Sequence, residues 1–151
     1  MKKLLKFFKD KIEIDSSIPI LEDNKLTLDC KNQNLKHFPF RIPDQHPIES
    51  IDISFNSIPE IPSCLNSLKF LNYSNNNLKE ISPSIEKAIL SYKALIELRI
   101  SSNSIELIPQ SFKLITTLKT LLSNNNKIKE FDITFQNLDV LDLSCNMLTS
   151  F

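Results

Sequence analysis

The residues of this 151-residue chain that could do covalent chemistry are three cysteines and two histidines. A histidine that takes the proton of a cysteine thiol creates a thiolate nucleophile, so a catalytic pair would combine His37 or His46 with Cys64 or Cys145. These four residues show no motif spacing that brings them together. A solvated loop histidine and a lone thiol are much commoner uses of the same residue types. We therefore expect no catalytic cysteine–histidine pair.

The absence of glycine excludes several classes of enzyme. About 7% glycine is ordinary, and this chain has 0. Without glycine there is no Walker-type phosphate loop, no G-x-G-x-x-G dinucleotide turn and no G-x-S-x-G nucleophile elbow. The 18 basic and 18 acidic side chains cancel, so no overall field attracts nucleic acid. We predict a protein that is not an enzyme, with no cofactor, no metal and no nucleic-acid partner.

A repeated pattern of leucine and asparagine runs along most of the chain. A leucine-type residue is followed at offsets of three, five, eight and ten by Leu or Ile, an apolar or small residue, Asn, and Leu or Ile. The five copies are IESIDISFNSI (48–58), LKFLNYSNNNL (68–78), LIELRISSNSI (95–105), LKTLLSNNNKI (118–128) and LDVLDLSCNML (138–148). Their asparagines, the asparagine ladder, are Asn56, Asn76, Asn103, Asn126 and Asn146, at steps of 20, 27, 23 and 20 residues.

A period of about 20–29 residues built on L-x-x-L-x-L-x-x-N-x-L is the leucine-rich-repeat signature, and the chain resembles that family past residue 25. The resemblance implies an α/β solenoid. In this curved coil a parallel β-sheet forms the concave face, and short helices or extended returns form the convex face. A degenerate copy, KLTLDCKNQNL (25–35), has Gln33 in place of Asn. We expect an amphipathic helix and cap over residues 1–24 and about six repeats over residues 25–151.

The alternation inside each copy predicts which side chains form the core. In L-x-L the apolar residues point one way and the residue between them points the other. The expected core pairs are Ile51 with Ile53, Leu71 with Tyr73, Leu98 with Ile100, and Leu141 with Leu143, while Leu121 is followed by the unusual Ser123. Each ladder asparagine both donates and accepts. It is therefore expected to bond backbone groups of its own coil and of the next one.

The return segments differ in length, and this predicts different conformations. The 20-residue steps are too short for a full helix and should return by extended or 3₁₀ backbone. The 27-residue step contains Ile85, Ala88, Ile89 and Tyr92 at three- and four-residue spacing, which indicates a short convex helix. This helix is a second place where a partner could bind.

The first 14 residues, MKKLLKFFKDKIEI, place apolar side chains on one helical stripe and lysines mostly on other faces. We interpret this segment as a helix that caps the open end of the solenoid. A basic helix lying on an anionic membrane is an alternative. A secretory signal is disfavoured because Lys6 and Lys9 interrupt its apolar region. At the other end the chain stops at Phe151, just past the last copy. A fragment of a longer protein, a homodimer through this uncapped end, or Phe151 folded over it are the alternatives.

Unclustered cysteines, at positions 30, 64 and 145, favour a reducing, cytoplasmic location. The repeat lengths leave the lineage open. The 20-residue form resembles repeats of secreted bacterial effectors, and the 23-residue form resembles repeats of eukaryotic intracellular scaffold and Ras-pathway proteins.

The outward-pointing residues of the strands are the predicted site for a protein partner. They are Ser50, Asp52, Phe55, Phe70, Asn72, Asn75, Glu97, Arg99, Thr120, Leu122, Val140 and Asp142. Phe70, Leu122 and Val140 are expected to form an apolar patch flanked by charged residues. The chain is thus predicted to be a protein-interaction scaffold that binds through its concave face. The alternatives are a regulatory region of a larger signalling enzyme, such as a phosphatase, cyclase or ubiquitin ligase, or a secreted bacterial effector domain.

Overall fold

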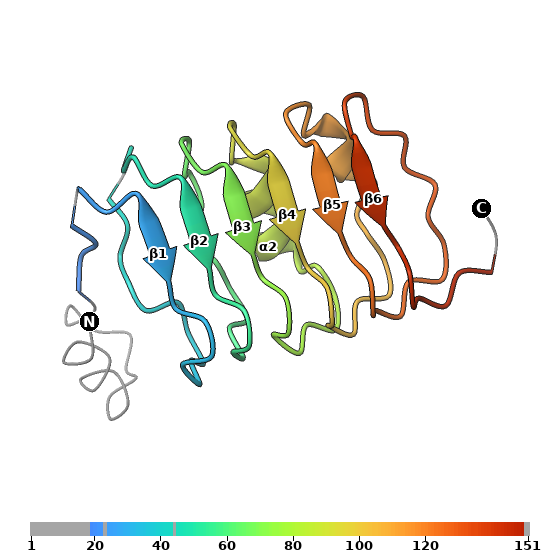
Figure 1. The fold of residues 1–151 in the computed structure, drawn as a ribbon, viewed down its shortest axis with the longest axis horizontal. Helices are drawn as coiled ribbons and strands as arrows, with labels where there is room; N and C mark the ends of the chain where they lie inside the picture. The colour runs from blue at the N-terminus through green and yellow to red at the C-terminus, as the bar shows by residue number, and fades with distance from the viewer. Residues whose placement is uncertain (1–18, 23, 44, 150–151) are drawn as a thin grey trace.

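The computed structural model describes residues 19–22, 24–43 and 45–149. Six short strands lie side by side in one open parallel sheet, in the order of the chain, with the return segments behind them (Figure 1). The strands are β1 (Thr27–Asp29), β2 (Ser50–Asp52), β3 (Phe70–Asn72), β4 (Glu97–Arg99), β5 (Thr120–Leu122) and β6 (Val140–Asp142). This confirms the predicted curved solenoid with a parallel sheet. The predicted N-terminal cap helix and Phe151 lie outside the described residues.

The register of the sheet aligns equivalent residues of successive repeats. The middle residue of each strand pairs with the middle residue of the next, as Leu71 pairs with Ile51 on one side and Leu98 on the other. The middle side chains therefore point into the coil, and the first and third residues of each strand point outward. Because this offset is constant, the outward residues form two straight rows across all six strands.

The predicted core pairs are buried in the second, third and fourth coils, where residues such as Ile53, Tyr73 and Ile100 have no exposed area. Ser123 is also fully buried, and its hydroxyl donates to the Asp142 carbonyl at 3.3 Å. The prediction is wrong for Leu141, which is 41% exposed. Leu141 belongs to the edge strand, and no further coil of the described residues packs over its outer side.

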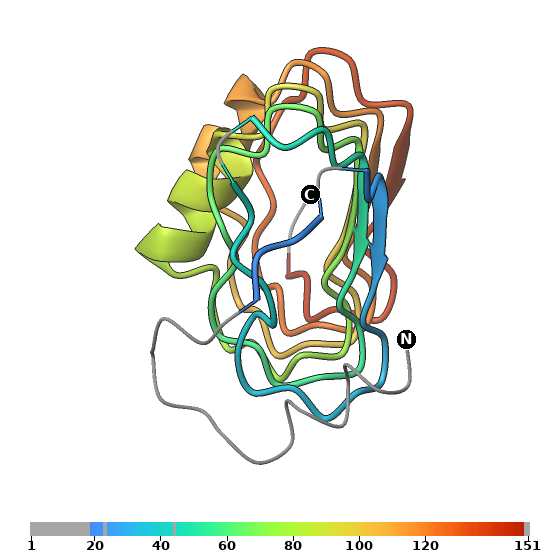
Figure 2. The same ribbon diagram turned by 90° about the vertical axis from the view of Figure 1, so that its left-hand side faces the viewer.

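The return segments follow their predicted lengths. The 27-residue step contains α2 (Pro83–Leu90), which buries Ile85, Ala88 and Ile89, and the 23-residue step contains the 3₁₀ helix η1 (Gln110–Leu114). The two described 20-residue steps contain no helix. Proline starts α2 and the Ser82 hydroxyl accepts from the Ile85 amide at 3.3 Å, so the helix begins with its first turn capped. Both helices lie on the side of the coil opposite the strands (Figure 2).

The first coil closes the β1 end of the core. Ile20 forms a parallel bridge with Arg41, and Leu21 is buried behind it. His46 is only 3% exposed, so the expectation of a solvated loop histidine is wrong for this residue. Its Nδ1 accepts from the Ile48 amide at 3.1 Å, which leaves Nε2 as the donor to the Glu22 carbonyl at 2.9 Å. Both ring nitrogens therefore bond backbone, and His46 has a structural role.

Among the residues that the structure describes, no helix is long and apolar enough to cross a bilayer.

Candidate functional site

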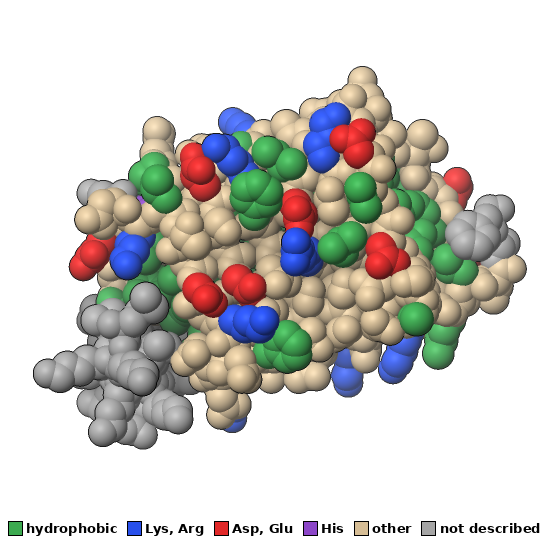
Figure 3. All heavy atoms as spheres, viewed as in Figure 1, with side chains coloured by type: hydrophobic (Ala, Val, Ile, Leu, Met, Phe, Trp, Pro, Cys, Tyr) green, Lys and Arg blue, Asp and Glu red, His purple; other side chains and the backbone are tan. Residues whose placement is uncertain are grey.

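The candidate site is the outward side of the six strands, here called the strand face. Figure 3 views this face and shows hydrophobic, acidic and basic side chains interspersed over it. Its first row consists of Thr27, Ser50, Phe70, Glu97, Thr120 and Val140, and its second row of Asp29, Asp52, Asn72, Arg99, Leu122 and Asp142. The ten residues from β2 to β6 that the sequence placed on this surface thus lie in two rows, and β1 adds Thr27 and Asp29.

A shallow depression of about 330 Å³ lies on the strand face across β2, β3 and β4. Phe70 is on the middle strand of the three, and 42% of this large apolar residue is exposed. Ser50 and Asp52 line one side, and Glu97 and Arg99 line the other. An aromatic ring surrounded by polar groups is an arrangement typical of an energetically important contact in a protein interface.

The apolar residues expected to form one patch are divided by a strand that carries charged residues. Phe70 lies on β3 and Leu122 on β5, and β4 between them carries Glu97 and Arg99. The Arg99 Nε donates to Glu97 Oε1, so an ion pair occupies the gap. Leu122 and Val140 remain neighbours on adjacent strands. The apolar groups of the strand face therefore form two separate areas, with the ion pair between them rather than at their rim.

The third residue of most strands closes the turn that follows it. Asp29, Asp52, Asn72 and Asp142 each accept from the backbone amide two residues later, at distances of 2.9 to 3.2 Å. Asp52 also accepts from Asn72 Nδ2 at 3.0 Å. The strands β4 and β5 instead have Arg99 and Leu122 at this position, which lack such a cap. Several predicted contact residues therefore also have a structural role.

The asparagine ladder holds the coils together at the ends of the strands. Asn103 is typical: its Nδ2 donates to the Ile100 carbonyl of its own coil and the Tyr73 carbonyl of the coil before, at 3.0 and 3.2 Å. Its Oδ1 accepts from the Leu78 amide at 3.0 Å. The neighbour is the preceding coil in every ladder position, whereas we expected the next coil.

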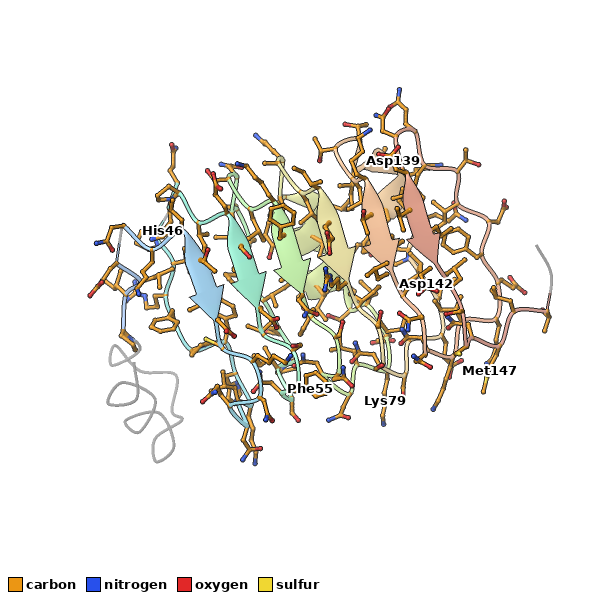
Figure 4. The ribbon with its side chains drawn as sticks, viewed as in Figure 1. His46, Phe55, Lys79, Asp139, Asp142 and Met147 are labelled. Atoms are coloured by element: carbon orange, nitrogen blue, oxygen red, sulfur yellow. The ribbon has the colours of Figure 1, made fainter. Side chains whose placement is uncertain are left out.

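Phe55 and Asn75 lie one residue before a ladder asparagine, at the end of the sheet toward which the strands point. Figure 4 shows Phe55, Lys79 and Met147 along this edge, whereas Asp139 and Asp142 lie at opposite ends of β6. The residue before each ladder position has a φ of 53° to 57° in all six coils of the described chain. Asparagine tolerates this left-handed conformation, but phenylalanine rarely adopts it. The exposed ring of Phe55 is covered on one side by the Lys31 ammonium, 5.4 Å from its centre.

Two ion pairs border the strand face where the chain enters the strands. Lys69 Nζ lies 2.8 Å from Glu49 Oε1, and Lys119 Nζ lies 3.7 Å from Asp139 Oδ2. Together with Thr27 and Asp29, these residues were absent from the predicted surface. Thr27 and Asp29 could have been found by aligning the degenerate first copy with the others. The ion pairs depend on a position one residue before each strand, which the L-x-L rule does not address.

Hydrogen bonding shifts the pKa of Asp142, and burial shifts the pKa of Cys30. The hydroxyl and backbone amide of Ser144 hold the pKa of Asp142 below its ordinary value, so this outward carboxylate stays charged at neutral pH. Burial, with smaller contributions from Asp29 and Asp52, raises the pKa of the Cys30 thiol to about 11. Cys30 is thus a neutral core residue, as expected, while Cys64 and Cys145 are exposed free thiols.

The chain is similar to one family model and to curated proteins. Residues 67–88 match the family model described as Leucine Rich Repeat. Leucine-rich repeat serine/threonine-protein kinase 1 of Mus musculus is 30% identical over 162 aligned positions, covering 97% of this chain and 8% of that protein. Leucine-rich repeats and immunoglobulin-like domains protein 3 of Homo sapiens is 28% identical over 113 positions, covering 73% of this chain and 10% of that protein. The chain spans a tenth or less of these relatives.

Proposed function

Because the chain is a leucine-rich-repeat protein, we propose that its strand face binds a protein partner. Leucine-rich repeats are modules typically used for protein–protein interaction and are generally not catalytic. Their stacked coils create an extended concave surface on which a partner can lie. The observation that most supports this site is Phe70, a large exposed apolar side chain in the depression across β2, β3 and β4.

The strand face is well suited to binding because its polar groups are already ordered. Asp52 is held by the Ser54 amide and by Asn72, and Arg99 is held by Glu97. The backbone beneath them is fixed by strand pairing and by the asparagine ladder. A surface ordered before binding loses little conformational entropy when the partner arrives, so more of the contact energy appears as affinity. The face therefore needs only a few apolar contacts, chiefly at Phe70, to hold a partner.

A pair of matched variants tests this site. The first combines Phe70→Ala with Arg99→Ala on the strand face. The second combines Leu114→Ala with Lys113→Ala on η1, which removes one exposed apolar residue and one cation from the opposite side of the coil. Each protein is immobilised and used to capture binding proteins from lysate of the source cells. We expect the strand-face variant to lose the proteins that the wild type captures, because truncating a central aromatic contact costs about 2 kcal/mol or more.

The melting temperature separates loss of binding from loss of fold. Both double variants change exposed side chains, so both should melt within a few degrees of the wild type. If the strand-face variant captures the same proteins as the wild type, the strand face is not the binding site. If only the η1 variant loses them, the partner binds the convex side, where α2 and η1 lie.

A second candidate function is regulation of a larger signalling enzyme, with these repeats as its recognition region. It is favoured by one observation: a relative that aligns with 97% of this chain is named as a serine/threonine-protein kinase. The test is to sequence the full-length transcript. An open reading frame that continues into a catalytic domain supports this candidate. A stop codon directly after Phe151 in the transcript contradicts it.

A cytoplasmic location is part of the proposal and is supported by the thiols. Cys64 and Cys145 are exposed and unpaired, and an oxidising compartment favours disulfide formation at such thiols. Fractionation of source cells, with mass-spectrometric readout of the redox state of Cys64 and Cys145, tests the location. Reduced thiols in the soluble cytoplasmic fraction are expected, and oxidised thiols in the secreted fraction would contradict it.

A further inference from the structure

We propose that the partner segment bound by the strand face is basic, with lysine or arginine side chains next to an apolar residue that packs on Phe70. This inference rests on the proposed function and names the chemistry of the partner. It is based on the distribution of charge over the two rows of the strand face, on the geometry around Phe70, and on the structural requirements of the turns.

The strand face is acidic although the chain as a whole is neutral. Its twelve residues include four carboxylates, on Asp29, Asp52, Glu97 and Asp142, and one cation, on Arg99, a formal charge of −3. The whole chain has 18 residues of each sign. Within the described chain, Glu97 is the one carboxylate of the two rows that has an ion-pair partner. The other three outward carboxylates, Asp29, Asp52 and Asp142, have no ion-pair partner in the described chain.

The turns do not require these negative charges. Asn72 closes its turn by accepting from the Ser74 amide at 3.2 Å, so an uncharged amide oxygen is sufficient at this position. Arg99 and Leu122 occupy the same position in the next two coils, where the chain turns without any such cap. Closing the turn therefore explains why the third strand residue carries a side-chain oxygen. It does not explain why this residue is a negatively charged aspartate at positions 29, 52 and 142.

The carboxylates are placed to receive cations beside an apolar contact. Phe70 lies on β3, and its neighbours across the sheet are Ser50 on β2 and Glu97 on β4, with Asp52 one row away on β2. A partner cation next to this apolar contact would meet both the exposed part of the Phe70 ring and the flanking carboxylates. The contact of the Lys31 ammonium with the Phe55 ring is the same kind of interaction within this chain.

An acidic partner is disfavoured by the same arrangement. Arg99 is the one cation of the two rows, and its guanidinium already bonds Glu97. A carboxylate brought to Arg99 would also approach Glu97 and would meet the negative field of the three aspartates of the second row. Complementary charge mainly raises the association rate and disfavours wrong partners. Among segments of similar apolar content, the acidic strand face should therefore prefer the basic ones.

In the experiment, a displayed library of short random peptides is selected for binding to the full chain. Clones that also bind the Phe70→Ala variant are discarded. The surviving peptides are measured against a triple variant, Asp29→Asn, Asp52→Asn and Asp142→Asn, in which each amide can still close its turn as Asn72 does. The matched control, Glu80→Gln, Glu130→Gln and Asp132→Asn, changes the net charge by the same amount at exposed residues away from the strand face.

We expect the surviving peptides to be rich in lysine and arginine. Their affinity should fall about tenfold or more in the triple variant or in high salt, and stay unchanged in the control. Neutral or acidic survivors, or equal binding to the triple variant, would overturn the inference and leave the strand face as a binding site. If no peptide depends on Phe70, both the inference and the proposed function fail. Melting curves of all variants show whether each protein is folded.

Discussion

The side chain of Asn103 accepts a hydrogen bond from the backbone of Asn76, with 2.8 Å between Asn103 Oδ1 and the Asn76 nitrogen. The two residues are equivalent positions of adjacent coils, so one ladder asparagine fixes the backbone of the one before it. The same Oδ1 also accepts from the Leu78 amide. In a chain without glycine, this bonding stabilises the left-handed turn at Asn75 that precedes Asn76.

Replacing Asn103 with Leu should lower the free energy of unfolding by about 2–4 kcal/mol, because several backbone groups lose their partners where water has little access. Urea denaturation followed by circular dichroism measures this change. The control is Asn66→Leu, which changes an exposed asparagine outside the ladder. Similar losses in the two variants would show that the ladder position has no special role.

Ile100 and Ser123 occupy the same position in neighbouring coils, and both have no exposed area. Ile100→Ala should destabilise the protein by about 2–5 kcal/mol, since it removes buried methyl groups and leaves a cavity. Ser123→Ala should cost about 1 kcal/mol or less, because the Ser123 amide still donates to the Asp142 carbonyl at 2.9 Å. Thermal and urea unfolding of the two variants tests this order, and a larger loss for Ser123→Ala would contradict it.

The raised pKa of Cys30 predicts that the folded chain loses stability at alkaline pH. Burial raises the pKa of its thiol from 9.0 to about 11 in the folded chain, so above pH 9 the unfolded chain loses this proton while the folded chain keeps it. The folded state therefore becomes less stable as the pH rises from about 9 to 11, by up to about 2–3 kcal/mol.

Cys30→Ala should be less stable at neutral pH but should show a smaller further loss in this alkaline range. Urea unfolding of both proteins across the range measures the difference. An equal alkaline loss in the two proteins would show that Cys30 is not its cause. At mildly alkaline pH, alkylation should modify Cys64 and Cys145 quickly and Cys30 slowly.

The parts of the structure that follow from local periodicity were predictable. Alternation within L-x-L gave the core residues Ile51, Leu71 and Leu98, and the three- and four-residue spacing from Ile85 to Tyr92 gave α2. These patterns work because every coil repeats the same contacts with its neighbours. The core assignment was wrong at Leu141, where no further coil of the described residues packs on one side.

Contacts between side chains of different coils were not predictable from the repeat. The spacing rule places Phe70 and Leu122 on one face, but it does not show that the Glu97–Arg99 pair separates them. It also does not predict that His46 is buried, or that its ring bonds the Glu22 carbonyl and the Ile48 amide. Such contacts depend on how the irregular returns pack, and the repeat motif does not specify those segments.

The most direct test of the strand face as the binding site is photo-crosslinking from single positions. A benzoylphenylalanine is placed at Phe70, at Leu122 or, as a control on the convex side, at Leu114, and each protein is irradiated in lysate of the source cells. We predict that the same partner crosslinks from Phe70 and Leu122 and not from Leu114. A partner that crosslinks from Leu114 alone would contradict the proposed function.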